Sequence, residues 1–398
     1  MIPTKKIPCC LPLLVLLVWS LSACSQAAPP QVQAALSAVE AVNTADSAGF
    51  ARVTAPRPFV FPDDHGPHPQ YQTEWWYYTG NLRSATGQSF GYQFTMFRRA
   101  LTPTPPERSS AWGTQNIYMA HLAVSDVANQ QFYAYERFSR DAADLAGATG
   151  DPFRVFLEDW SVEGSGPEGM RMRLHAAEGE IALNLVLESL KSPVLQGDQG
   201  LSQKGTEIGN ASYYYSLTRM RTTGTLTIDG QVHAVQGLSW MDHEFGTSAL
   251  EGDATGWDWF SIQLDDGRDL MYAEVRGATG PQYAFGSLVA ADGTARTLTA
   301  DEVVLTVLDT WHSPRSQAVY PARWRLTLSP PCPPPAGGCE ELTLELTPRL
   351  ADQELPLTIV YWEGAVDITG TQNGQPVLGH GYVELTGYAE AAPEGYTR

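Results

Sequence analysis

Hydrophobic residues recur at every second position over most of this chain, and this alternation constrains its fold more than any other feature. The pattern is clear at residues 90–96 and 181–187, and similar runs continue to about residue 388. Alternate side chains of a β-strand point to opposite faces, so a period of two predicts strands. Asp229-Gly230 and Asp266-Gly267 separate such runs and are typical of hairpin turns. Many short strands at near-regular spacing predict an all-β chain, folded as sandwiches or barrels.

The second half of the alternating region repeats the first. A shift of 182 residues brings apolar positions into coincidence: Trp75 with Trp257, Tyr77 with Trp259, Tyr78 with Phe260 and Leu82 with Leu264. Such a repeat indicates two similar β domains, which we place at residues 59–246 and 247–390. Past the first hairpin turn the shift becomes 180 residues, because the second hairpin loop is two residues shorter. At equivalent positions Asp258 replaces Trp76, and Glu274 replaces Phe94. Acids in place of rings predict a polar patch specific to the second half.

The first residues carry an export signal rather than a folded element. Two lysines precede an apolar stretch at residues 11–18, which is too short for a permanent transmembrane helix. Leu21-Ser22-Ala23-Cys24 resembles a bacterial lipobox, which implies removal of a signal peptide (1–23) and acylation of Cys24. An ordinary signal peptide with an incidental cysteine is the alternative. Because serine rather than aspartate follows the cysteine, we expect a lipid-anchored protein of the bacterial cell envelope, at the outer membrane and facing the periplasm.

Residues 24–58 are rich in Ala, Gln and Pro, and they predict a flexible tether between the anchor and the globular part. Cys332 and Cys339 are the cysteines that remain once the signal peptide and the acylated cysteine are set aside. An even pair across a short turn, in an oxidising compartment, predicts a local disulfide.

The charge of the chain excludes one class of partner. Its 44 acidic residues outnumber its 25 Lys and Arg residues, for a formal net charge of -19. Loss of two lysines with the signal peptide would take this to -19 - 2 = -21. No basic patch survives this balance, so we expect no nucleic acid partner. The P-loop sequence Gly-x-x-x-x-Gly-Lys-Ser/Thr and the zinc motif His-Glu-x-x-His are missing, which leaves P-loop kinase and zinc-protease functions without support.

The segment Asp63-Asp64-His65-Gly66-Pro67-His68 has the residue types of a metal site. Two prolines, Pro62 and Pro67, shape it as a rigid loop, and no further Cys or His cluster accompanies it in the sequence. A structural turn or a pocket lid is the better interpretation. We therefore expect no metal and no organic cofactor.

Three ionisable residues, Asp242, His243 and Glu244, stand in a row inside the apolar and aromatic run 240–246. On a strand, Asp242 and Glu244 face one side and His243 faces the other. A carboxyl group buried among aromatic rings has a raised pKa and stays protonated near neutrality, so it can donate a proton. These three residues are our catalytic candidates. The alternatives are an acid pair that caps backbone amides and a structural histidine.

The densest aromatic run, at residues 74–80, offers rings for a ligand site. Alternation sends Trp75 and Tyr77 to one face of the strand, and Trp76 and Tyr78 to the other. One pair belongs in the core, which leaves the other pair free to line a cavity or an interface. We take these residues as candidates for binding an apolar ligand: Trp75, Tyr77, His121, Trp240, Trp257, Trp259, Tyr272 and Glu274.

Five ordered motifs together resemble the AttH-type branch of the hydroxyneurosporene synthase (carotenoid 1,2-hydratase) family. They lie at residues 64–68, 72–80, 240–246, 256–261 and 361–366. The resemblance implies two tandem lipocalin-like β domains. It also implies, as an activity, the addition of water to the terminal double bond of an acyclic carotenoid, while many members of this branch have no assigned reaction.

Two functions follow from these observations. As an enzyme, the chain would bind an isoprenoid-like molecule near the domain junction, protonate a C=C bond and let water capture the cation, as a hydro-lyase does. As a carrier, it would hold a lipid or another hydrophobic ligand in the periplasm without changing it, alongside an export machine. A scaffold in envelope assembly is the weakest hypothesis, because a scaffold has no need of acids between tryptophans.

Overall fold

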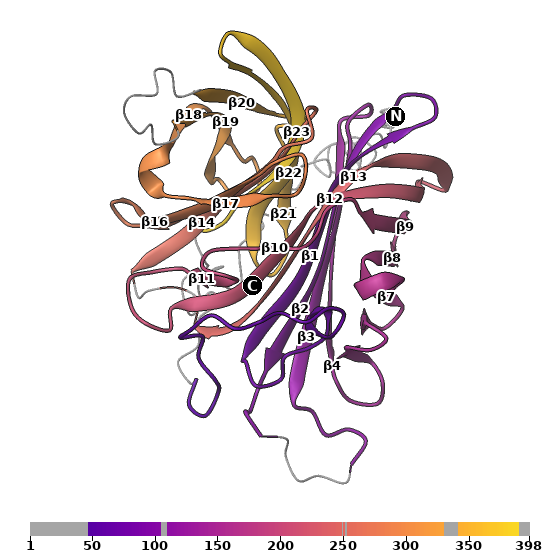
Figure 1. The fold of residues 1–398 in the computed structure, drawn as a ribbon. Coiled ribbons are helices and arrows are strands. Elements are labelled where there is room, and N and C mark those ends of the chain that lie inside the picture. The colour runs from indigo at the N-terminus through magenta and orange to yellow at the C-terminus, as the bar shows by residue number, and fades with distance from the viewer. Residues whose placement is uncertain (1–46, 105–109, 249, 251–252, 330–340, 390–398) are drawn as a thin grey trace, which may run out of the picture. The chain divides into compact units, whose positions relative to one another are not determined.

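Antiparallel strands form nearly all of the regular secondary structure in the part of the chain that the structure, a computed structural model, describes (Figure 1). The described residues are 47–389, with gaps at 105–109, 249, 251–252 and 330–340. The all-β prediction is confirmed. The predicted signal peptide, Cys24 and the Cys332–Cys339 pair lie outside the described residues.

The first sheet has 13 strands. They are β1 (Thr73–Ser84), β2 (Ser89–Ala100), β3 (Asn116–Asp126), β4 (Gln131–Arg140), β5 (Ala146–Thr149), β6 (Arg154–Leu157), β7 (Trp160–Ser165), β8 (Arg171–Glu178), β9 (Ile181–Ser189), β10 (Val194–Leu195), β11 (Leu201–Gln203), β12 (Ala211–Ile228) and β13 (Gln231–Ser248).

The second sheet has 10 strands. They are β14 (Ala254–Leu264), β15 (Asp269–Gly277), β16 (Gly280–Val289), β17 (Ala295–Leu298), β18 (Val303–His312), β19 (Val319–Leu328), β20 (Leu342–Pro348), β21 (Glu354–Pro356), β22 (Val360–Gln372) and β23 (Gln375–Leu385). The described helices are short 3-10 turns: η1 (Asp63–His65), η2 (Pro167–Gly169) and η3 (Ala300–Glu302). Within the described part of the chain, no helix has the length and apolar character needed to cross a bilayer.

The two sheets share a strand order. The first runs β4-β3-β2-β1-β13-β12-β9-β8-β7-β6-β5, and the second, which lacks counterparts of β6 and β5, runs β17-β16-β15-β14-β23-β22-β20-β19-β18. In each, the first strand lies between the second strand and the last. Trp75 on β1 and Trp257 on β14, which the sequence repeat matches, therefore occupy equivalent strands. These are the two tandem lipocalin-like β domains that the sequence predicted.

A long side chain of β4, Arg137, reaches across the open side of the first barrel. Arg137 on β4 donates a hydrogen bond of 3.1 Å to the carbonyl of Ala177 and one of 2.7 Å to Glu178, both on β8. Its guanidinium group also lies 4.6 Å from the ring centre of Trp160 on β7. This residue helps to make the first barrel nearly closed.

The alternation predicted for residues 74–80 is present in β1, and the structure decides which pair is internal. Trp76 and Tyr78 are fully buried in the core of the first barrel. Trp75 and Tyr77 point the other way, toward the second sheet, and pack with Trp257 and Trp259. The face of β1 outside the first barrel is therefore covered by the second sheet rather than by water.

The last residues of the predicted tether pack against the first sheet. Val53 is buried in a cluster with Tyr71, Tyr213 and Phe245. The hydroxyl group of Tyr213 donates a hydrogen bond of 2.7 Å to the carbonyl of Ala55. The globular part of the chain thus begins before residue 59, because apolar residues that look isolated in the sequence find partners on β12 and β13.

A buried ionic contact joins the two sheets. Asp269, at the start of β15, is fully buried and is held by three residues of the first half. Lys191 and Thr218 donate to its Oδ2 atom at 2.7 and 2.8 Å, and Arg219 donates to Oδ1 at 2.8 Å. A buried carboxylate is tolerated only when it is paired in this way.

Candidate functional site

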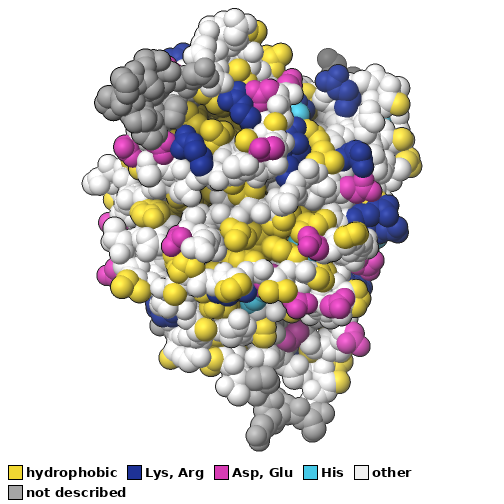
Figure 2. All heavy atoms as spheres, in the orientation of Figure 1, with side chains coloured by type: hydrophobic (Ala, Val, Ile, Leu, Met, Phe, Trp, Pro, Cys, Tyr) yellow, Lys and Arg dark blue, Asp and Glu magenta, His cyan; other side chains and the backbone are white. Residues whose placement is uncertain are grey.

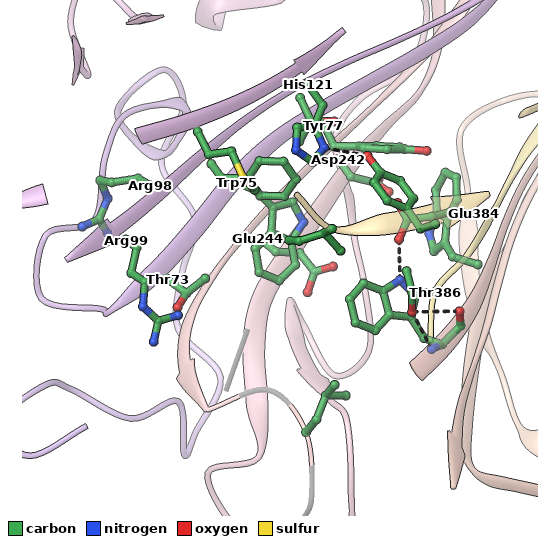
Figure 3. Close-up of a pocket in the computed structure, with 18 of the residues that line it drawn as sticks. Thr73, Trp75, Tyr77, Arg98, Arg99, His121, Asp242, Glu244, Glu384 and Thr386 are labelled. Atoms are coloured by element: carbon green, nitrogen blue, oxygen red, sulfur yellow. Dashed lines mark hydrogen bonds between the residues drawn. The ribbon is translucent and has the colours of Figure 1, made fainter. Parts of the chain in front are cut away.

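A cavity of about 290 Å³ lies between the two sheets, and most of its lining is apolar (Figure 3). One wall comes from β1, β2, β3 and β13, and the other from β14, β15, β16 and the ends of β22 and β23. Figure 3 shows Arg98, Arg99 and Thr73 at one side of this space and Glu384 and Thr386 at the other. On the face drawn in Figure 2, hydrophobic side chains gather in the middle and charged side chains lie mainly around them.

Strand register brings the first wall together. Trp75 and Tyr77 on β1 pair with Glu244 and Asp242 on β13, so all four side chains share one face. The residues between them on each strand, such as Trp76 and its partner His243, face the interior of the first barrel. The predicted split of Asp242 and Glu244 from His243 is confirmed by this geometry.

The second wall repeats this arrangement. Trp257 and Trp259 on β14 line the cavity, and Trp259 pairs with Glu384 on β23. The indole N–H of Trp257 donates a hydrogen bond of 2.5 Å to Oε1 of Glu384. An acid thus stands beside a tryptophan on this wall, as Asp242 stands beside Tyr77 on the other.

Asp242 is the most deeply enclosed acid of the first wall. Its side chain is 3 % exposed and accepts hydrogen bonds from Ser216 at 2.5 Å, from Tyr214 at 2.7 Å and from the indole N–H of Trp240 at 2.7 Å. Burial raises the pKa of Asp242, the three hydrogen bonds oppose this, and the result is a pKa of about 7. The carboxyl group is therefore partly protonated at neutral pH. It also borders the aromatic cavity.

Glu244, two residues on, has a different environment. Its Oε2 atom lies 2.9 Å from the ammonium group of Lys204 and accepts a hydrogen bond of 2.5 Å from Ser212. Lys204 also lies 4.2 Å from the ring centre of Phe285. Glu244 thus lines the cavity as one member of an ion pair, which suits it to a charged role rather than to proton donation.

Two further acids in this region were not among the sequence candidates. Glu384 borders the cavity, and burial raises its pKa to about 7. Glu363 on β22 pairs with Glu384 in register, is fully buried and accepts a hydrogen bond of 2.5 Å from Tyr77. Burial and the neighbouring Glu384 raise the pKa of Glu363 well above its ordinary value. An acid inside the apolar run 359–366 was the available signal, and it is the same signal that singled out Asp242.

His121 lines the cavity, as predicted. Its Nδ1 atom lies 2.8 Å from the hydroxyl oxygen of Tyr361, and its Nε2 atom lies 3.2 Å from Oε2 of Glu136. The ring is almost wholly buried. It therefore connects a cavity tyrosine of the second sheet with a partly exposed carboxylate on β4.

Four sequence candidates do not line the cavity. Trp240 lies behind it and reaches it through Asp242. Tyr272 and Glu274 occupy the opposite face of β15 from the cavity residues Ala273 and Val275, because Tyr272 pairs with Phe260 in the second barrel. His243 is the fourth, and its contacts are described next.

His243 belongs to a buried polar cluster inside the first barrel. Its Nε2 atom lies 2.9 Å from Oε1 of Glu74, and its ring stacks on Trp76 at 4.9 Å. Burial lowers the pKa of His243, and the hydrogen bond to Glu74 only partly offsets this. The histidine is therefore held behind the strand, on the face opposite Asp242, and does not reach a ligand in the cavity.

The same cluster contains donor atoms of the kind that bind metals. Ligand atoms of His68, Glu74 and His243 lie within 4.8 Å of one another. Arg98 donates to Glu74 at 2.8 Å, so this carboxylate already has a counter-charge. His68 also bonds Asp64 at 2.9 Å, and its ring stacks on Phe245 at 3.5 Å. These contacts tie the loop at residues 62–72 to β1 and β13, which agrees with the structural turn expected from the sequence.

Comparison with known proteins identifies the family. The family model described as AttH-like matches residues 52–388, nearly all of the described chain. The chain belongs to the AttH-like family. The crystal structure of an AttH protein from Nitrosomonas europaea is 35% identical to the chain, with a TM-score of 0.74, and covers 86% of this chain and 100% of its own. No curated protein matches the AttH-like chain.

Two other solved structures share the fold. Kievitone hydratase from Nectria haematococca has a TM-score of 0.62 at 15% identity, covering 85% of the AttH-like chain and 96% of its own. CghA with bound Sch210972 has a TM-score of 0.51 at 13% identity, covering 79% and 88%. At such identities the likeness shows the fold alone, which is one that accommodates a hydratase.

Proposed function

We propose that this AttH-like protein binds an isoprenoid-like apolar molecule in the cavity between its sheets and adds water to a C=C bond. The proposed activity is that of a hydro-lyase of the carotenoid 1,2-hydratase type. The observation that carries this proposal is Asp242, a carboxyl group with a pKa of about 7 that lines an aromatic cavity. Protonation of an alkene requires an undissociated acid held where water cannot compete for its proton.

The reaction balances without another reagent. Asp242 gives its proton to one carbon of a trisubstituted C=C bond, the π electrons form the new C–H bond, and the other carbon becomes a tertiary cation. A water molecule bonds to that carbon through oxygen and loses one proton to a carboxylate of the cavity. The product is a tertiary alcohol, and the net change is the addition of one water.

Aromatic faces supply the environment for the cation. Tyr77, Trp257 and Trp259 line the space next to Asp242, and the ring centres of Tyr77 and Trp259 are 5.1 Å apart. A cation above an aromatic face gains roughly 0.5–2 kcal/mol per ring. The Glu244–Lys204 ion pair also lines the cavity, so a carboxylate oxygen and an ammonium group both border this space.

The cavity size bears on the ligand. Its volume of about 290 Å³ is at the lower end of the range, roughly 300–1,000 Å³, of pockets that bind small molecules. The space therefore suits a short terpenoid, or one end of a longer carotenoid whose remainder extends out of the cavity. Terminal hydration of an acyclic chain requires only that its end reach Asp242.

We also propose that the chain works at the cell envelope. The support is the lipobox-like sequence that ends at Cys24, which would place the protein on a lipid surface where apolar substrates are found. Metabolic labelling with a fatty acid would test it, and a Cys24→Ser variant should lose the label.

The hydration proposal is tested with the full chain in detergent micelles. Lycopene, an acyclic carotenoid, or a shorter acyclic terpene is incubated in water enriched in oxygen-18, and incorporation of the label is measured by mass spectrometry. The Asp242→Asn variant should lose at least about 100-fold in rate. A Glu274→Gln variant, which changes an acid on the far face of β15, should retain the wild-type rate.

The carrier hypothesis predicts a different result. Wild type and Asp242→Asn would then bind the same ligand with the same affinity and return it unaltered. Equal label incorporation by both proteins would also overturn the role proposed for Asp242.

A further inference from the structure

Two carboxyl groups lie side by side at the second wall of the cavity. Glu363 on β22 and Glu384 on β23 are register partners, so their side chains share one face of adjacent strands. Glu363 is fully buried, whereas the accessible part of Glu384 borders the cavity. The Oε2 atom of Glu363 has no hydrogen-bond partner among the described residues.

Two such neighbours cannot both be ionised. Two like charges on neighbouring side chains repel strongly in a low-dielectric environment, so such a pair of carboxyl groups retains one proton between its members. The hydrogen bonds around the pair fit this state. Tyr77 donates to Oε1 of Glu363, and Trp257 donates to Oε1 of Glu384, so these two bonds leave the Oε2 atom of each carboxyl group to carry the shared proton.

A line of hydrogen-bonding groups leads from this pair toward solvent. Tyr361 hydrogen bonds Glu363 and also lies 2.8 Å from Nδ1 of His121. The other ring nitrogen of His121 lies 3.2 Å from Glu136, whose side chain is 15 % exposed. Each group on this line can both give and accept a proton, because tyrosine and histidine are amphoteric.

We propose that Glu363 and Glu384 form a carboxyl dyad that holds one proton and exchanges it with solvent through Tyr361, His121 and Glu136. The dyad deepens the proposed function and rests on it for its use in catalysis. It is the base that takes the proton released when water bonds to the cation.

The proton balance makes one acid the proton donor and the other the proton acceptor. Asp242 on the first wall gives a proton to the substrate, and water gives one to the ionised oxygen of the dyad on the second wall. Release of that proton through His121 to Glu136 restores the dyad. After the product leaves, Asp242 takes up a proton from bulk solvent, which balances the proton released to solvent at Glu136. One turnover therefore moves one proton across the cavity and consumes one water.

Infrared spectroscopy of the intact protein in light and heavy water tests the dyad without any substrate. The measurement uses the Asp242→Asn background, because Asp242 is itself partly protonated at neutral pH. In this background the protein should show a protonated-carboxyl band that is lost when Glu363→Gln or Glu384→Gln is added. A band that survives both additions would overturn the dyad.

The exchange route has its own readout. After transfer to heavy water, the dyad band should shift at least about tenfold more slowly in Tyr361→Phe than in wild type. His121→Asn serves as a second variant, so that misfolding of one protein does not decide the result. An unchanged exchange rate in both folded variants would overturn the route. The two proposals can fail separately. If the infrared band and the slowed exchange are observed but no hydration is detected, the proposed function is wrong and the dyad is still supported.

Discussion

Asp242 and Glu384 occupy equivalent positions in the two sheets. Asp242 pairs with Tyr77 on the first strand of the first sheet, and Glu384 pairs with Trp259 on the first strand of the second. Tyr77 and Trp259 are themselves matched by the sequence repeat. The two acids reach one cavity from opposite walls, and each has a pKa raised by burial to about 7. A repeated strand order thus supplies a pair of proton-exchanging groups.

Hydration should depend on pH in one direction above neutrality. Because Asp242 acts as an acid, its protonated form is active, and this form is lost as pH rises through its pKa of about 7. We expect the rate to fall about tenfold for each pH unit above 8. The pH–rate profile of the wild type with saturating substrate measures this, and a rate that increases up to pH 9 would contradict the assignment.

Stability should also depend on the protonation of Asp242, over a lower pH range. The folded-state pKa of Asp242 lies above its ordinary value of 3.8, so the folded state binds more protons between about pH 4 and pH 7. The free energy of unfolding therefore falls as pH rises through this window. A shift of this size corresponds to something on the order of 4 kcal/mol.

The Asp242→Asn variant should lack this contribution. Its stability relative to wild type, measured by urea unfolding, should increase from pH 4 to pH 8 by that order of magnitude. A difference between Asp242→Asn and wild type that does not change with pH would refute the shift.

Binding of a polyene should quench the tryptophans of the cavity and spare those of the barrel cores. Trp259 lines the cavity, whereas Trp160 is fully buried in the first barrel. With lycopene in micelles we expect quenching of the emission to be at least halved in Trp259→Phe and to persist in Trp160→Phe. Equal loss in both variants would place the ligand elsewhere.

His243 should matter for stability rather than for the chemical step. Replacement by alanine removes the hydrogen bond to the fully buried Glu74 and the stack on Trp76. Leaving a buried charged group with a partner missing, together with a cavity, costs about 3 kcal/mol. Chemical denaturation of His243→Ala measures this, with His175→Ala on β8 as the control.

In His243→Ala the turnover of the remaining folded protein should stay within about threefold of wild type. A loss as large as that of Asp242→Asn would show that the histidine takes part in the reaction.

The alternation of apolar residues was sufficient to predict the fold class, because burying one face of a strand forces a period of two. It also predicted that Asp242 and Glu244 share a face. It could not tell whether Trp75 or Trp76 lies inside the barrel, because both sides of β1 are buried. That choice depends on the second sheet, which covers the outer face.

The misplaced candidates and the missed acids have physical reasons. Tyr272 and Glu274 were chosen from the repeat, but they share the face of Phe260 rather than that of Trp259. Glu363 and Glu384 were missed although the sequence holds a signal for their pairing, the Asn373-Gly374 turn between β22 and β23. A two-residue Asn-Gly turn sets the register of its hairpin, and this register places Glu363 opposite Glu384, 21 positions away.

Because three residues of the first half bind Asp269 of the second half, the stability of each half depends on the other. Lys191, Thr218 and Arg219 all precede residue 246, so a fragment that begins at residue 254 would leave this carboxylate without its partners. Neither barrel should therefore survive as an excised fragment. Heating should melt the intact protein in a single cooperative transition, and a cut between the barrels should yield two aggregating pieces instead of two working ones.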